Sequence, residues 1–314
     1  MSLKQEVFMT VHDSAEGGNV VLDPTGLRID FDIRLIPKFN RATFTIYNLT
    51  EATVKSLVDG GRYVTLKTRL HNGEIYTLAN RFFVSNAVDE LKLPERITTL
   101  YCFDNLKKTL LERQVNYTAH DTSLEGMMKK LTGNVSVDYK SFPIGLTSER
   151  GLLETRPLQG TVRECISGLE KEFKFTTFTD NGGLLAMYLP DLKNVAVTSL
   201  VDKKSEVTLH TTAMRSNPKI GIANATIHSN LDGRIKPTSV LDLSKLLTIG
   251  SDSDERTLQL VDKYLKNYSS FSKYQAFAVN HTGSTHTSDW STKVTALSPT
   301  KGKLMSTVTW AQIK

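Results

Sequence analysis

The chain has little of what secreted and membrane proteins require. It holds two cysteines in 314 residues, Cys102 and Cys165, which excludes a disulfide framework and favours folding in a reducing compartment. No run approaches the roughly 20 consecutive apolar residues of a membrane-spanning helix. Residues 1–9 lack the apolar centre of a signal peptide. We therefore expect a protein made in a cytoplasm, with no membrane insertion by this chain.

The sequence also lacks catalytic and cofactor-binding motifs. It has no G-x-S-x-G nucleophile elbow, and no two carboxylates stand out for glycoside hydrolysis. Cys165 falls on the apolar stripe of a predicted helix, where a thiol packs in the core rather than reacts. Gly17-Gly18 and Gly182-Gly183 mark turns and open no helix, unlike a phosphate-binding loop. We expect no catalytic residue, no cofactor and no enzymatic activity.

The most site-like cluster is a loop that contains His281, His286 and Asp289. Two imidazoles and a carboxylate could hold a divalent metal. However, the histidines lie in a Gly/Ser/Thr loop and no further ligand follows in a known pattern, so we expect a strand–loop–strand unit with Trp290 as a core anchor. Residues 251–255 resemble half a calcium loop but lack its later glycine and glutamate, which favours an acidic helix start.

The charge pattern does not favour nucleic-acid binding. The net charge of +6 comes from 39 Lys+Arg against 33 Asp+Glu, and the basic residues form no continuous patch. They occur as scattered pairs, which we interpret as solvated surface: Lys107-Lys108, Lys129-Lys130 and Lys203-Lys204. An OB-like barrel that binds single strands stays an alternative, with steeply salt-dependent binding as its signature.

Regular alternation of apolar and polar residues is the strongest structural signal in the chain. It predicts a long β-hairpin over Leu27–Leu49, with a Pro/Asn loop between the strands. The solvent face of the first strand carries two cations that flank two anions, which suits charge pairing with another strand. A long regular hairpin is typical of a β-barrel or an intersubunit sheet, so it favours an assembly protein. The alternating polar residues are Arg28, Asp30, Asp32 and Arg34.

Most of the first hundred residues or so are predicted to form strands. The exception is a short helix capped by Thr50, with Val54, Leu57 and Val58 on one face. The expected strands are residues 7–11, 19–22, 63–70, 75–78, 82–87 and 96–103.

The middle of the chain is predicted to contain both helices and strands. Capping boxes at residues 122–125 and 161–164 predict two helices, residues 174–189 form a hairpin, and residues 142–157 form a loop. Strands return from about residue 207. We expect them at residues 219–229, 240–243, 246–249, 275–280, 292–297 and 303–310, with a helix over residues 258–268.

The predicted fold class is therefore mainly β with an α+β insert. The expected domains are residues 1–104, a β-region that forms a barrel or a sandwich; residues 105–205, a small α+β middle domain; and residues 206–314, a second β-region. Each β-region contains one helix between strands, which is a weak indication of a duplicated module.

Four stretches resemble the baseplate hub proteins of contractile-tailed bacteriophages, the late-control and tail-hub family. One departure is Ser284, where the family pattern has an acidic residue after the loop glycine. No glycine-rich spike repeat and no lysozyme-like segment is present, so spike and lytic parts are expected on other chains. The stretches are RIDFDIRLIPKFNRATFTIYNLT from Arg28, TSLEGMMKKL from Thr122, GTVRECISGLEKEF from Gly160 and NHTGSTHTSDWSTKVTA from Asn280.

The resemblance implies a structural virion protein with two barrels similar to the tail tube subunit. Three chains would form a homotrimer that presents six barrels in a ring. This ring would join the six-fold tail tube, or a distal tail protein, to the three-fold central spike. It would surround a channel for the tape measure protein and for DNA ejection, in a virion baseplate assembled in the host bacterial cytoplasm. The long hairpin would pair between neighbouring chains through its free edges.

Two other classes stay open. Another tail or secretion-tube ring component, such as a distal tail protein or spike adaptor, would also be built from β-barrels but would show six-fold symmetry or a different partner. A cell-wall hydrolase predicts that alanine at His281, His286 or Asp289 abolishes an activity while the fold survives.

Overall fold

The computed structural model describes most of the chain in thirteen stretches. They are residues 6–24, 26–37, 39–58, 61–69, 73–120, 123–133, 135–140, 156–180, 183–188, 206–220, 224–243, 273–287 and 289–297.

Strands from both ends of the chain form one 13-stranded sheet. Eleven of its strands pair in the order β14-β15-β18-β17-β3-β4-β7-β6-β5-β1-β2. The other two form a branch, in which β16 pairs with β17 and β13 pairs with β16. The N-terminal strands are β1 Glu6–His12, β2 Val20–Leu22, β3 Ile29–Leu35, β4 Arg41–Tyr47, β5 Tyr63–Arg69, β6 Ile75–Lys92 and β7 Glu95–Phe103. The C-terminal strands are β13 Glu206–Thr208, β14 Lys219–Ile220, β15 Asn224–Asn230, β16 Val240–Asp242, β17 Lys273–Ser284 and β18 Ser291–Leu297, with a 3-10 helix at Thr211–Ala213.

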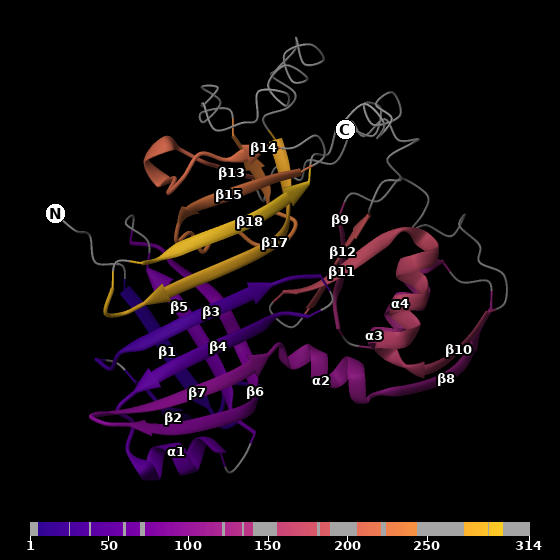
Figure 1. Cartoon of the computed structure of the whole chain (residues 1–314). Helices are drawn as coiled ribbons and strands as arrows, with labels where there is room; N and C mark the ends of the chain where they lie inside the picture. The colour runs from indigo at the N-terminus through magenta and orange to yellow at the C-terminus, as the bar shows by residue number, and fades with distance from the viewer. Residues whose placement is uncertain are drawn as a thin grey trace, which may run out of the picture.

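The two strand-rich regions meet where β3 pairs antiparallel with β17, in the register Leu35↔Val279 to Asp30↔Ser284. Figure 1 shows the yellow C-terminal strands directly beside the indigo N-terminal ones. A single hydrophobic core continues across this seam, with Phe44 and Ile33 from one region and Val279 and Ala276 from the other. The alternation in the sequence causes this, because every second side chain of β3 and β4 turns into the core.

The helix α1, Glu51–Val58, follows the hairpin and covers one end of the sheet. Thr50 caps it, accepting a hydrogen bond from the Thr53 amide at 3.3 Å. Val54 and Leu57 are buried as predicted, whereas Val58 is 56% exposed. The prediction for Val58 was wrong: it is the last residue of the helix, and its side chain stays exposed while Leu57 beside it is buried.

The middle region is a separate α+β unit with its own core of apolar side chains. Its two sheets are β8 with β10, antiparallel, and β11-β12-β9, and its helices lie beside them in Figure 1. The elements are α2 Asn105–Glu112, β8 Gln114–Ala119, α3 Leu124–Thr132, β9 Val137–Lys140, β10 Arg156–Thr161, α4 Val162–Phe173, β11 Phe175–Asp180 and β12 Gly183–Tyr188.

The predicted fold class, mainly β with an α+β insert, is confirmed. The β3–β4 hairpin, the β11–β12 hairpin and α4 with its capping box all form where expected. Cys165 is buried on the packed face of α4, as predicted for a core thiol.

Several local predictions were wrong. The hairpin has no free edges, because β3 pairs with β17 and β4 pairs with β7. Residues 75–78 and 82–87 belong to one long strand, β6, which bends at Arg81 with φ 52° instead of ending there. β14 and β15 pair antiparallel with each other, so residues 219–229 are not one strand. Ser123 rather than Thr122 caps α3.

Other predictions missed elements or fall outside the described stretches. The helix α2 and the strands β8 and β10 were not predicted, and Arg156 and Pro157 belong to β10 rather than to a loop. The rest of the predicted loop, residues 142–155, lies outside the described residues, as do the predicted strands at 246–249 and 303–310 and the predicted helix at 258–268.

Candidate functional site

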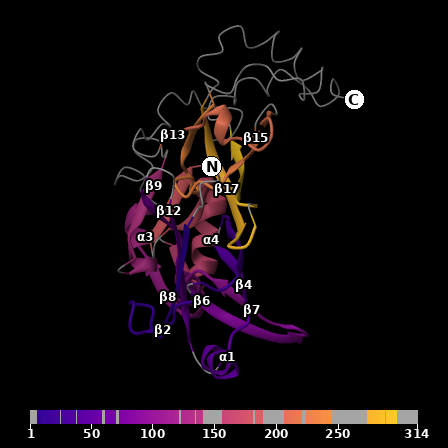
Figure 2. The ribbon, with the colours of Figure 1, turned by 90° about the vertical axis from the view of Figure 1, so that its left-hand side faces the viewer.

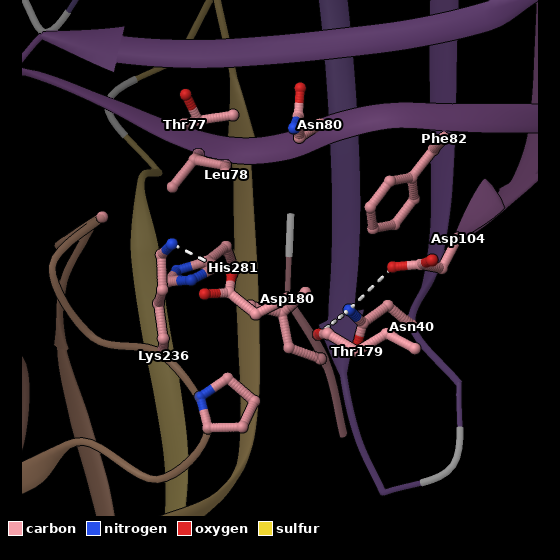
Figure 3. Close-up of a pocket in the computed structure, with 13 residues that line it drawn as sticks. Asn40, Thr77, Leu78, Asn80, Phe82, Asp104, Thr179, Asp180, Lys236 and His281 are labelled. Carbon is pink, nitrogen blue, oxygen red and sulfur yellow. Dashed lines mark hydrogen bonds and ion pairs between the residues drawn. The ribbon is translucent and has the colours of Figure 1, made fainter. Parts of the chain in front are cut away.

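Polar side chains from all three regions meet at one junction, shown in Figure 3. They surround a small cavity of about 20 Å³. The contributors are Asn40 from the β3–β4 loop, Asp104 between β7 and α2, Thr179 and Asp180 at the end of β11, Lys236 after β15, and His281 on β17. The junction therefore fixes how the middle region sits against the large sheet.

Asn40 is the central connector of this junction. Its side chain is 3% exposed, and its amide nitrogen Nδ2 donates to the Thr179 carbonyl at 2.8 Å and to Asp104 Oδ2 at 3.4 Å. Its Oδ1 has no hydrogen-bond partner within the described stretches. A cavity of this size beside an unpaired acceptor suits one ordered water molecule.

Asp104 couples the junction to α2. Its Oδ1 accepts a hydrogen bond from the Leu106 amide at 2.8 Å, which caps the start of that helix. Burial raises the pKa of the Asp104 carboxyl, with the nearby Asp180 charge acting in the same direction, and hydrogen bonds from its neighbours oppose the rise. The sequence carried a signal for this role, since an Asp directly before a helical apolar stripe is a common cap.

An ion pair closes the other side of the junction. Lys236 Nζ lies 3.0 Å from Asp180 Oδ1, and both side chains are about one-third exposed. Close by, the rings of Phe178 and Phe277 meet edge to face at 5.8 Å between centroids. The β11–β12 hairpin is thus attached to the C-terminal strands by one polar and one aromatic contact.

His281, the first of the predicted metal candidates, is a buried core residue. It is 1% exposed, its Nδ1 lies 3.0 Å from Thr292 Oγ1, and the Ile235 carbonyl also hydrogen-bonds the ring. Burial lowers the pKa of the imidazole to about 4. The ring is therefore hydrogen-bonded inside the protein, and the side chain is neutral at physiological pH.

The other two candidates lie elsewhere. His286 and Asp289 are exposed in the β17–β18 loop, and Asp289 Oδ1 is 3.2 Å from Arg215 Nη1. Trp290 is the core anchor expected of this loop: it is 8% exposed, its ring meets Phe31 edge to face at 5.7 Å, and its Nε1 donates to the Thr287 carbonyl at 2.7 Å. Within the described residues, no three His, Cys, Asp or Glu side chains gather in a metal-binding group.

A buried charge network holds the middle region together. Arg163 and Glu170 on α4 are each 8% exposed and form a two-pronged pair, with Nη2 to Oε2 at 2.8 Å. Thr177 on β11 donates to Glu170 Oε1 from both its amide, at 2.8 Å, and its hydroxyl, at 2.6 Å. The guanidinium also lies 5.4 Å from the centre of the Phe39 ring. This places an α4 side chain against the β3–β4 loop.

The charged side chains at β3 pair with each other locally. Arg28, directly before β3, pairs with Asp30 at 3.3 Å, and on β3 itself Arg34 pairs with Asp32 at 2.8 Å. The predicted cross-strand charge pairing is therefore wrong, because each cation pairs with the anion two residues away along the chain. No helix in the described part of the chain is long and apolar enough to cross a bilayer.

No protein-family model and no curated protein sequence matches the chain. The solved structures similar to it include two tail proteins and a component of a secretion system. A tail protein from Neisseria meningitidis has a TM-score of 0.55 at 10% identity, covering 93% of this chain and 96% of that one. The 43 kDa tail protein of prophage MuSo2 from Shewanella oneidensis has a TM-score of 0.55 at 8% identity, covering 94% and 98%.

The third is an E. coli component of the type VI secretion system, described as structurally similar to the T4 bacteriophage tail proteins gp27 and gp5. It has a TM-score of 0.50 at 10% identity, covering 95% of this chain and 75% of that one. At these identities the likeness shows the fold, and the chain has the fold of these tail proteins over nearly its whole length.

Proposed function

We propose that the chain is a structural hub subunit of a phage tail baseplate, without enzymatic activity. The observation that carries this proposal is the likeness to two tail proteins over 93% and 94% of the chain, which also takes in nearly the whole of each tail protein. A match of that extent includes the large sheet and the middle region together, rather than one common module.

In this proposal three chains form a homotrimer. Residues 1–104 and 206–314 act as the two tube-like units of each chain, and residues 105–205 form the domain between them. Six such units would meet the six-fold tail tube, or a distal tail protein, on one side, and the trimer would meet the three-fold central spike on the other. The channel would hold the tape measure protein and later pass DNA.

The continuous pairing across the β3–β17 seam supports this role. Six opposed residue pairs in an antiparallel ladder and a shared core join the two strand-rich regions, so they cannot rotate against each other without breaking the sheet. A subunit that changes symmetry from six to three needs two tube-like units held at a fixed angle. The junction around Asn40 adds the middle region to this rigid body.

Electron microscopy of the purified protein, alone and with its candidate spike, tests the proposal. We expect three-fold rings with an open centre and six peripheral lobes. Six-fold rings would instead assign the chain to a tube or distal tail ring. Single-chain particles in both samples would contradict the hub.

A second candidate is a spike adaptor or hub of a secretion tube. The similarity to the type VI secretion component favours it, because that protein shares the fold and comes from a different machine. Co-purification separates the two candidates: a phage hub should bind its own tail tube or distal tail protein, and a secretion hub should bind the secretion tube.

A further inference from the structure

We propose that the tip of the β6–β7 hairpin of one chain docks into a hollow on the sheet of a second copy of this chain. The tip is residues 90–95, and the hollow lies on the outer face of β3, β4 and β7. The contact itself follows from the surface described below. Its closure into a ring of three rests on the proposed function.

The tip is the most exposed apolar feature of the described sheet. Leu91 and Leu93 are 70% and 85% exposed. Figures 1 and 2 both show the β6–β7 hairpin reaching out beyond the neighbouring strands. Isolated exposed leucines are common, but two of them on one projecting turn mark a contact surface.

The strand that leads to the tip also has an open edge. β5 pairs with β6 only over residues 75–83, so residues 85–92 of β6 have β7 on one side and no paired strand on the other among the described residues. Long open edges are normally covered or blunted. The bridges of Glu90 with Lys92 and of Asp89 with Arg96 add some charge to this edge but do not cover it.

The hollow has a volume of about 400 Å³ and is open to solvent. Arg34 and Arg41 lie at its rim directly opposite each other in the β3–β4 register, an arrangement of like charges that costs stability unless an anion joins it. Asp32 pairs with Arg34, whereas no ion-pair partner for Arg41 occurs in the described part of the chain.

Aromatic rings make the hollow and its border suitable for leucine side chains. Tyr101 is 45% exposed and lines the hollow together with Phe103. From Phe103 a half-buried row continues across the same face to Phe83 and Tyr63, with ring centroids 5.4 Å and 5.5 Å apart. An apolar tip gains most where such rings are already partly desolvated.

The charges of the two surfaces are complementary. The tip carries Glu90 and Glu95 against Lys92, a net charge of −1. The hollow carries Arg34 and Arg41 against Asp32, a net charge of +1. A tip glutamate placed beside Arg41 would provide the missing anion.

A chain cannot fill its own hollow. The tip ends at Glu95, which lies six residues before Tyr101 on β7. At about 3.4 Å per residue, the tip and the hollow of one chain are about 20 Å apart. The occupant must be another molecule. A second copy offers both surfaces at once, so each chain can give a tip and receive one. Used head to tail, this contact closes into a ring when the rotation between copies closes, and exchanged reciprocally between two chains it gives a two-fold dimer.

The first test compares self-association of the wild type with that of the double variant Leu91→Asp/Leu93→Asp, by sedimentation velocity over a range of concentrations. Both leucines are exposed, so the fold should survive, as circular dichroism can verify. We expect at least about a tenfold loss in the association constant. The matched control is Val20→Asp on β2, which is 54% exposed and should have no effect.

The second test reverses the charges. Arg41→Glu and Glu90→Arg should each weaken association, and the two together should restore it. For direct proof, Leu93→Cys and Thr43→Cys are placed on two differently tagged chains and oxidised. A disulfide between the two tags is expected. Cys102 lines the hollow but is buried, and burial raises its thiol pKa, so it should not compete.

The outcomes separate this inference from the proposed function. If the Leu91→Asp/Leu93→Asp variant still forms three-fold particles and the Leu93→Cys and Thr43→Cys chains do not cross-link, the tip contact is overturned and the hub proposal stands. Cross-linking in an assembly without three-fold symmetry would keep the contact and reject the hub. Links only between two Leu93→Cys tips, or a tip that captures the spike or tube protein instead of a copy, would overturn the inference. So would a wild type that never self-associates.

Discussion

Acidification from pH 7.5 to pH 5 should destabilise the large sheet through His281. The imidazole is buried with a pKa of about 4, whereas in the unfolded chain its pKa is about 6.5. Above pH 6.5 the ring is neutral in both states. Between pH 6.5 and pH 4 the unfolded chain binds a proton that the folded protein does not, so the free energy of unfolding falls as the pH falls.

The size of this effect follows from the two pKa values. Integrating the proton uptake from pH 7.5 to pH 5 gives a loss of about 2 kcal/mol, and the full difference below pH 4 is about 3 kcal/mol. The neighbouring Asp232 raises the His281 pKa and Lys236 lowers it, and both are smaller causes than burial.

Urea unfolding at pH 7.5 and pH 5 measures the effect in the wild type and in His281→Gln. Other groups also titrate in this range, so the quantity of interest is the difference between the two proteins. We expect the wild type to lose about 2 kcal/mol more than the variant. The control is His286→Gln, because His286 is exposed. If wild type and His281→Gln lost the same stability on acidification, the assignment of His281 as a buried neutral residue would be refuted.

Two further predictions concern the buried polar groups of the middle region and the junction. Arg163→Met should lower the free energy of unfolding by about 3–5 kcal/mol, because it leaves Glu170 buried and unpaired. The double variant with Glu170→Met should recover most of this loss in urea unfolding, and additive losses would contradict a coupled pair. Asn40→Ala should cost about 1–3 kcal/mol and speed amide hydrogen exchange in β11, where Thr179 loses its donor. Exchange changes confined to the β3–β4 loop would show that Asn40 does not hold the junction.

Sequence patterns predicted those elements that form through interactions between residues close together in the chain. The period of two in β3 and β4 matches their alternating burial. The capping box at Thr161 and Glu164 forms with both of its hydrogen bonds, because such a box needs only residues three positions apart. The place of Trp290 was also predictable, since a large aromatic between two strands anchors their connection.

Long-range pairing was not predictable in the same way. Nothing near Ile33 in the sequence indicates that its strand will pair with the one that carries His281. The continuity of β6 depends on Arg81 adopting a positive φ, which few non-glycine residues do. The junction around Asn40 and Asp104 was missed for the same reason: its members are ordinary polar residues until the fold brings them together.

The error over the hairpin edges has a physical cause that applies to assembly proteins in general. A strand with strict alternation is the easiest to place inside a sheet, because one face fills the core and both edges can find partners. The most regular strands of a chain are therefore poor candidates for contacts between subunits. Residues 85–92 show the opposite character, with Val88, Asp89 and Leu91 all exposed and no clear apolar face. Such a segment gains little from burial within its own sheet, so an intersubunit contact should be sought there.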